Sequence, residues 1–158
     1  MMPEEIIEIY TDGSCNKEYQ VGAWAALIFY QGKKILLEGI HKNTTHNRME
    51  LMAVIRAINY TNKQKFVFDK FRVYTDSQYV AGIPLRAYKL TARDFTTKQG
   101  KDIRNKDLVK TFLRLIQDMN IEFIKVKAHQ KTTATINYNR EVDQQVRKRV
   151  RQQVNAMK

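Results

Sequence analysis

The sequence predicts an α/β protein of one domain, built on a five-stranded mixed sheet that is flanked by helices. Three apolar stretches follow one another near the N-terminus, which predicts antiparallel strands joined by short turns. Farther along, helical spacing alternates with two short strand-like stretches, and strand–helix–strand connections predict parallel pairing. The 158 residues suffice for one hydrophobic core, so we expect a single domain over 1–158.

β-branched and aromatic residues identify the five predicted strands, at 5–11, 21–30, 33–40, 70–75 and 121–127. The pair Gln31-Gly32 between the second and third strands predicts a short hairpin turn. Apolar residues at i, i+3, i+4 and i+7, beginning at Leu51, predict a helix over 47–62. Further helices are predicted from Ser77 to about 82, over 105–119 and from about 139 onward. The basic stretch 86–104 has weaker periodicity and is expected to be helix or helix plus loop.

The chain carries a formal net charge of +12, which favours a polyanionic partner, with nucleic acid ahead of a membrane. The positive charge is concentrated between Arg86 and Lys110 and again near the C-terminus, in a cluster of Arg140, Arg147, Lys148, Arg149 and Arg151. Such clusters are typical of surfaces that bind phosphates. A basic surface that serves solubility alone is the alternative.

Nothing in the sequence predicts a membrane or secreted protein. No apolar run reaches about 18 residues, and the acidic start "MMPEEIIEIY" has the wrong charge order for a secretory signal. Cys15 is the single cysteine, so no internal disulfide can form, and a reducing cytoplasm is the expected location. No sequence feature indicates a partner subunit, so we expect a monomer.

The segment Tyr-Thr-Asp occurs twice, at 10–12 and at 74–76, each time at the end of a predicted strand. Asp12 and Asp76 are therefore expected near one edge of the sheet, where ligands bind in open α/β folds. Two more acids, Glu50 and Asp143, lie at predicted helix N-termini. The four acids come from distant parts of the chain, and a mixed sheet can bring them together.

Each of the four acids also has a structural explanation. Asp12 precedes Gly13-Ser14, a sequence typical of turns. Glu50 could form a capping box with Asn47. Asp76 or Ser77 could cap the helix that follows them. Asp143 could lie in the first turns of a helix that Asn139 caps, where the helix dipole favours a negative charge.

Several carboxylates held close together repel one another and raise one another's pKa unless cations neutralise them. Hard divalent ions such as Mg²⁺ are bound by a few carboxylates, with water and substrate phosphate completing the shell. Two such ions about 4 Å apart stabilise both the attacking and the leaving oxygen of an in-line phosphodiester displacement. An acidic metal site in a basic protein therefore predicts phosphodiester chemistry on a nucleic acid.

Five segments together resemble the motifs of the type 1 ribonuclease H family. They occur in order across nearly the whole chain, as "YTDGSCN" at 10–16, "TTHNRMELMAVIRAI" at 44–58, "YTDSQYV" at 74–80, "VKAH" at 126–129 and "NREVD" at 139–143. The resemblance implies a ribonuclease H-like fold and an enzyme that uses Mg²⁺ or Mn²⁺ to hydrolyse the RNA strand of RNA–DNA hybrids, leaving a 5′-phosphate and a 3′-hydroxyl. The alternatives are a non-catalytic module on the same fold that binds hybrid or double-stranded RNA, and a relative that acts on DNA.

The resemblance places the family's acidic quartet on Asp12, Glu50, Asp76 and Asp143. It implies that Asp12 bridges two metal ions, that Glu50 and Asp76 complete one shell, and that Asp143 holds the ion beside the attacking water. His129 corresponds to the family's loop histidine, with a role in proton transfer or product release. The implied substrate contacts are Ser14, Cys15, Asn47, Met49 and Gln78 on the RNA strand, Asn16 and Thr45 on the DNA strand, Arg48 on a phosphate, and Asn139 in the last motif.

Some positions depart from the family's pattern or allow a second interpretation. Ala128 stands where Gly is common, His46 where Asn is common, and Arg140-Glu141 reverses the usual order. Some family members carry a basic handle built around tryptophans; here the single Trp is Trp24, so charge and position alone favour a handle over 86–104. Cys15 as a buried small residue and Arg48 in a salt bridge are the alternatives to their substrate contacts.

Overall fold

The computed structural model describes residues 3–126 and 134–158, and in α5 it describes side chains from 137 onward. Its strands are β1 (Ile6–Asn16), β2 (Val21–Tyr30), β3 (Lys33–Lys42), β4 (Lys70–Thr75) and β5 (Ile121–Lys125). Its helices are α1 (His46–Lys63), α2 (Gln78–Gly82), the 3₁₀ turn η1 (Pro84–Arg86), α3 (Ala87–Ala92), α4 (Lys106–Ile116) and α5 (Ala134–Met157).

The five strands form one mixed sheet in the order β3-β2-β1-β4-β5. β1 pairs antiparallel with β2 and β2 with β3, whereas β1 and β4 as well as β4 and β5 are parallel. The turn between β2 and β3 has positive φ at both Gln31 and Gly32, as a tight hairpin requires. The predicted α/β class and mixed five-stranded sheet are confirmed.

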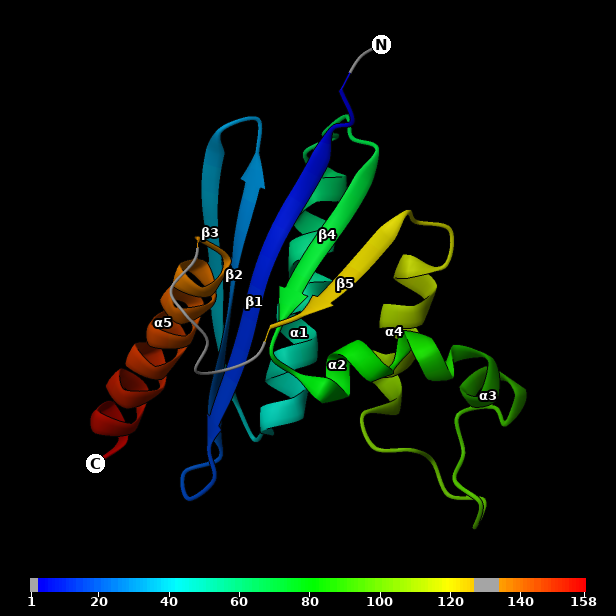
Figure 1. The fold of residues 1–158 in the computed structure, drawn as a ribbon. Coiled ribbons are helices and arrows are strands. Elements are labelled where there is room, and N and C mark those ends of the chain that lie inside the picture. Colours follow the sequence, from blue (N-terminus) through cyan, green and yellow to red (C-terminus); the bar gives the residue numbers. More distant parts are fainter. Residues whose placement is uncertain (1–2, 127–133) are drawn as a thin grey trace.

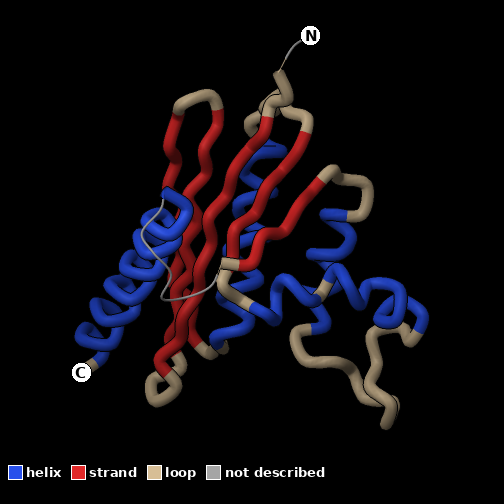
Figure 2. Tube along the Cα trace, in the orientation of Figure 1, coloured by secondary structure: helices blue, strands red, loops and turns tan. Residues whose placement is uncertain are grey.

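Helices cover both faces of the sheet (Figure 1; Figure 2). On one face, α1 and α4 bury a core that includes Ile7, Ile9, Leu51, Ile58, Phe71 and Phe112. On the other face, α5 lies across β1 and β2 and buries a row of valines against Tyr10, Ala23, Ala25, Leu27 and Tyr74. The alternation of side chains along β1 and β4 divides these strands between the two cores.

Two helix starts differ from their predictions. Thr45, and not Asn47, caps α1, because its hydroxyl accepts a hydrogen bond from the Arg48 N–H at 3.2 Å. The capping box of Asn47 with Glu50 is therefore wrong. α5 begins at Ala134, so Asn139 lies inside the helix and does not cap it. Ser77 caps α2, because its side chain accepts a hydrogen bond from the Val80 N–H at 3.1 Å. Of the two caps that the sequence offered, Asp76 and Ser77, the structure has Ser77.

The first predicted strand is longer than its sequence pattern indicated. β1 continues through Gly13-Ser14 to Asn16, with Gly13 paired to Trp24 of β2, so the expected turn after Asp12 is wrong. The basic stretch 86–104 contains α3 and then a loop that the Thr96–Asp102 bridge closes, which confirms helix plus loop.

Candidate active site

The two Tyr-Thr-Asp segments lie side by side because β1 and β4 are parallel and in register. Tyr10 pairs with Tyr74, and their rings stack with centroids 4.4 Å apart and an interplanar angle of 5°. The two threonines that follow are fully buried. The next residue is Asp12 within β1 and Asp76 directly after the end of β4, so the repeated segment brings two carboxylates together where β4 ends beside β1.

Gly13 brings the third carboxylate close. A Cβ added to Gly13 would lie 2.3 Å from the backbone nitrogen of Glu50 and 2.4 Å from the carbonyl carbon of Met49. The first turns of α1 can therefore pack directly on β1 because residue 13 has no side chain. This contact places Glu50 beside Asp12.

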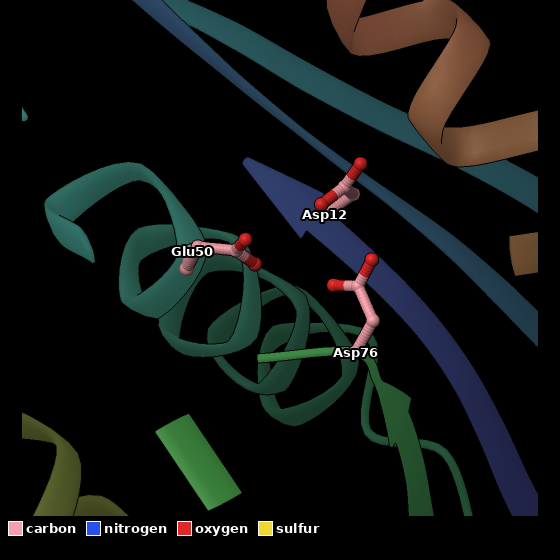
Figure 3. Close-up of side chains that lie close together, drawn as sticks. All are labelled: Asp12, Glu50 and Asp76. Carbon is pink, nitrogen blue, oxygen red and sulfur yellow. The ribbon is translucent and has the colours of Figure 1, made fainter. Parts of the chain in front are cut away.

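Three carboxylates converge at this place. Asp12, Glu50 and Asp76 each offer an oxygen, and these oxygens all lie within 4.8 Å of one another. Figure 3 shows the three side chains turned toward a common space from β1, from α1 and from the end of β4. Asp12 and Glu50 are 4% and 3% exposed, whereas Asp76 is partly exposed. Two of the three charges are thus held away from bulk water.

The surroundings raise the pKa of all three carboxyls. Burial, as the largest cause, and the nearby Glu50, Asp76 and Asp143 together raise the pKa of Asp12 to about 10. Burial also raises the pKa of Glu50, although a hydrogen bond from His46 opposes this shift. For Asp76 burial is again the first cause and Asp143 the second. Each shift records a cost of holding negative charge here without a compensating cation.

The donor set fits a hard divalent cation. All the converging ligand atoms are carboxylate oxygens, which Mg²⁺ and Mn²⁺ prefer. The Glu50 Oε1 atom accepts from His46 at 2.9 Å, but the buried Oε2 atom has no hydrogen-bond partner among the described residues. A buried oxygen without a partner is costly, and a bound cation would satisfy it.

A cavity of about 450 Å³ opens beside the three carboxylates. Asp143 of α5 lines this cavity, although it is not one of the three acids within 4.8 Å of one another. Its carboxylate forms an ion pair with Arg147, one helical turn along, at 3.2 Å. The structure thus brings the first three predicted acids together and places the fourth at the wall of the same cavity. His129 lies outside the described residues.

The predicted substrate contacts divide into two groups. Ser14, Asn47 and Gln78 line the cavity, and Thr45 caps the helix beside it. Asn16, Cys15 and Asn139 do not line the cavity. The Asn16 side chain accepts from the Tyr19 N–H at 3.0 Å, the Cys15 thiol lies 3.3 Å from the Thr44 carbonyl oxygen, and Asn139 has a buried Oδ1 atom without a partner among the described residues.

Two further predicted contacts have other surroundings. Met49 is 1% exposed, and its side chain packs in the core beside Trp24 and Ala53. Arg48 forms two hydrogen bonds to the Asp107 carboxylate, both at 2.9 Å, which is the salt bridge that the sequence offered as the alternative to a phosphate contact. Asp107 also holds Arg48 against the start of α4, where the basic stretch ends.

His46 and Arg147 also line the cavity, and the sequence pattern did not predict either of them as a neighbour of the acids. His46 precedes Glu50 by four positions and Arg147 follows Asp143 by four, and residues four apart lie next to each other on a helix. The i, i+4 spacing is visible in the sequence and predicts that each of these residues lies beside its acid.

Comparison with known proteins identifies the family. A family model described as RNase H matches residues 4–151. The chain belongs to the ribonuclease H family. Ribonuclease H of Chromobacterium violaceum is 38% identical over 95% of this chain and 98% of the relative. Ribonuclease H of Nitrosospira multiformis is 41% identical over 79% of each chain. As a member of this family, the protein is an enzyme, a metal-dependent nuclease.

A solved ribonuclease H structure has the same fold. The crystal structure of LC9-RNase H1, a type 1 RNase H with the type 2 active-site motif, superimposes with a TM-score of 0.70. The match covers 89% of this chain and 71% of that chain at 24% identity, so it bears on the fold alone. Among the described residues, no helix of this ribonuclease H is long and apolar enough to cross a membrane.

Proposed function

We propose that this ribonuclease H is a metal-dependent endonuclease that hydrolyses the RNA strand of RNA–DNA hybrids and leaves 5′-phosphate and 3′-hydroxyl ends. The convergence of Asp12, Glu50 and Asp76 on one cavity carries the proposal, together with membership of the family. The net charge of +12 supports a polyanionic substrate around this acidic centre.

The four acids Asp12, Glu50, Asp76 and Asp143 would hold two ions, with Mg²⁺ ahead of Mn²⁺. When bound, such a pair stabilises the attacking and leaving oxygens of an in-line displacement. Asp12, buried beside Glu50 and Asp76, would be a ligand in the middle of the site, and Asp143 would hold an ion from the cavity wall, beside the attacking water. His129 would move a proton or assist product release.

Substrate recognition would rest on sugar and phosphate contacts, because these do not depend on base sequence. Ser14, Asn47 and Gln78 at the cavity are suited to the 2′-hydroxyls that distinguish the RNA strand. The basic stretch 86–104 would act as a handle for the hybrid. We further propose that residues 1–158 function as one domain, as a monomer, in the cytoplasm, where the lone Cys15 stays reduced.

The proposal predicts strand-specific, metal-dependent cleavage. With Mg²⁺, the protein is expected to cut the RNA strand of an end-labelled hybrid and to leave matched RNA and DNA duplexes intact. With a chelator, cleavage of the hybrid stops. A gel of the labelled products, with end-group analysis, reads the outcome. Binding of the hybrid without cleavage at any Mg²⁺ or Mn²⁺ concentration would instead indicate a binding module.

The raised pKa of Asp12 predicts how stability depends on pH. In the metal-free protein, folded Asp12 has a pKa of about 10 and stays protonated at pH values where the unfolded chain has lost this proton. The free energy of unfolding should therefore decrease as the pH rises from about 4 toward about 10. Mg²⁺ replaces the proton, so it should raise the melting temperature more at about pH 8 than at about pH 6.

Thermal melts with Mg²⁺ and with a chelator at both pH values measure this difference. Asp12→Asn is the control, because it removes the titrating group. The same dependence on pH in the variant would show that Asp12 is not its source.

A further inference from the structure

The two flanks of α5 have different surroundings. A row of valines, at 142, 146, 150 and 154, is buried against the sheet. One flank beside this row faces β3. There Lys34 pairs with Glu141 at 2.9 Å, and Glu38 pairs with Arg149 at 3.3 Å. The charges of this flank therefore hold α5 against the edge strand β3.

The opposite flank of α5 leads away from the active site. Asp143, Arg147 and Arg151 follow one another at intervals of four residues, so they form one row along the helix. The first two line the active-site cavity. Arg151 continues the row by one turn, and Lys148 lies next to it on the outward side. The cavity and this row of cations are therefore continuous.

The far part of this row has positive charge without a local counterion. Lys148 and Arg151 are exposed, and neither forms an ion pair with any residue in 3–126 or 134–158. The segment 144–158 contains five cations and no acidic residue. Cations that serve only solubility are usually mixed with acids, as they are on the β3 flank.

We propose that Lys148 and Arg151 bind phosphates of the substrate nucleic acid beyond the cleavage position, as an extension of the active site along α5. The inference rests on the proposed function. Eight residues of helix separate Asp143 from Arg151, which is about 12 Å along the axis. One strand of a duplex advances about 3.4 Å per nucleotide, so the contact falls three to four nucleotides from the cleaved phosphate. Figure 1 shows that α5 leads from beside β1 to the C-terminus, and Lys148 and Arg151 are exposed in this part of the helix.

The test compares two hybrids that share one central cleavable RNA tract. In one hybrid the duplex ends about two base pairs from the cleaved phosphate, short of the three to four nucleotides that separate it from Arg151, and in the other the duplex continues for about twelve. The double variant Lys148→Gln/Arg151→Gln removes the proposed contact. Its matched control is Lys63→Gln/Arg149→Gln, which removes one Lys and one Arg charge elsewhere, the latter from the β3 flank of the same helix. Melting temperatures establish that both proteins are folded.

For the long hybrid, the double variant should raise KM about five- to thirtyfold at low salt and leave kcat within about twofold. The slope of log(kcat/KM) against log salt should become shallower by about 1 to 2, because each lost phosphate contact contributes about 0.9. KM for the short hybrid should not change. The control should behave like the wild type on both hybrids.

Three results would overturn the inference: no change for the long hybrid, an equal change for both hybrids, or the same change in the control. If the double variant binds anionic vesicles more weakly than the wild type but binds the hybrid equally well, the row binds a membrane instead. If the wild type cleaves neither hybrid, the proposed function fails. Equilibrium binding of the two hybrids in chelator then tests the phosphate contact separately.

Discussion

Replacing Asp12 by Asn is expected to abolish hybrid cleavage and to raise the melting temperature of the metal-free protein. Asp12 lies at the centre of the acidic cluster, with the carboxylates of Glu50 and Asp76 within 4.8 Å. A neutral amide cannot hold a divalent ion in the same way, and the ion's contribution to the transition state is several kcal/mol. We therefore expect a loss of at least about 10³-fold in kcat/KM, since each 1.36 kcal/mol corresponds to a factor of ten.

The gain in stability has the same physical cause as the loss of activity. Burial and three neighbouring carboxylates raise the pKa of Asp12 to about 10, so at neutral pH the folded state must either bind a proton there or hold an unfavourable charge. Asn has nearly the same shape and removes this cost. A gain of about 1 kcal/mol corresponds to about 2–4 °C in a domain of this size.

Single-turnover cleavage and thermal melts in chelator measure the two effects. Asp118→Asn is the matched control, because Asp118 is an exposed acid away from the cavity and the same change in charge should alter neither quantity. Wild-type turnover by Asp12→Asn would overturn the assignment of the site. A marked fall in its melting temperature would show that Asp12 stabilises the fold rather than the metal.

The repeated Tyr-Thr-Asp segment shows how much of the site the sequence predicts. The period-2 pattern places Phe71 and Val73 on one face of β4 and Tyr74 on the other, and the structure confirms this division between the two cores. The same Tyr-Thr-Asp sequence at the ends of two predicted strands is sufficient to predict that Asp12 and Asp76 lie close together. The in-register parallel pairing of Tyr10 with Tyr74 is the reason.

The errors arise where a residue's role depends on a distant segment. Gly13 looks like a turn residue beside its neighbours in the chain, but its role is set by α1, which starts thirty-three residues later. Met49 has the sequence context of a substrate contact, and only the packing of α1 on β1 shows that its side chain is buried. The start of α5 is earlier than predicted, because the valine row begins at Val142 but Tyr138, four residues before it, packs against the same core and extends the row toward Ala134.

Replacing Gly13 by Ala is expected to cause the largest loss of stability of any single methyl added to this protein. The new Cβ would lie 2.3 Å from the Glu50 nitrogen and 2.4 Å from the Met49 carbonyl carbon, and both are backbone atoms of α1. A side chain can rotate away from such a clash, whereas a helix backbone must move as a unit. β1 and α1 would have to separate, at a cost of about 3 kcal/mol or more, the upper range for overpacking a core.

The same displacement should affect the site, since α1 carries Glu50 and β1 carries Asp12. Any Gly13→Ala protein that folds should lose most of the stabilisation by Mg²⁺, because its carboxylates no longer lie close enough to share an ion. Urea unfolding with and without Mg²⁺ measures both effects. Gly82→Ala is the matched control: its Cβ would meet nothing within 4 Å, and Ala in a helix should stabilise the protein by about 0.5–1 kcal/mol. If the two variants were equally stable, the close approach of α1 to β1 would not be what holds Glu50 beside Asp12.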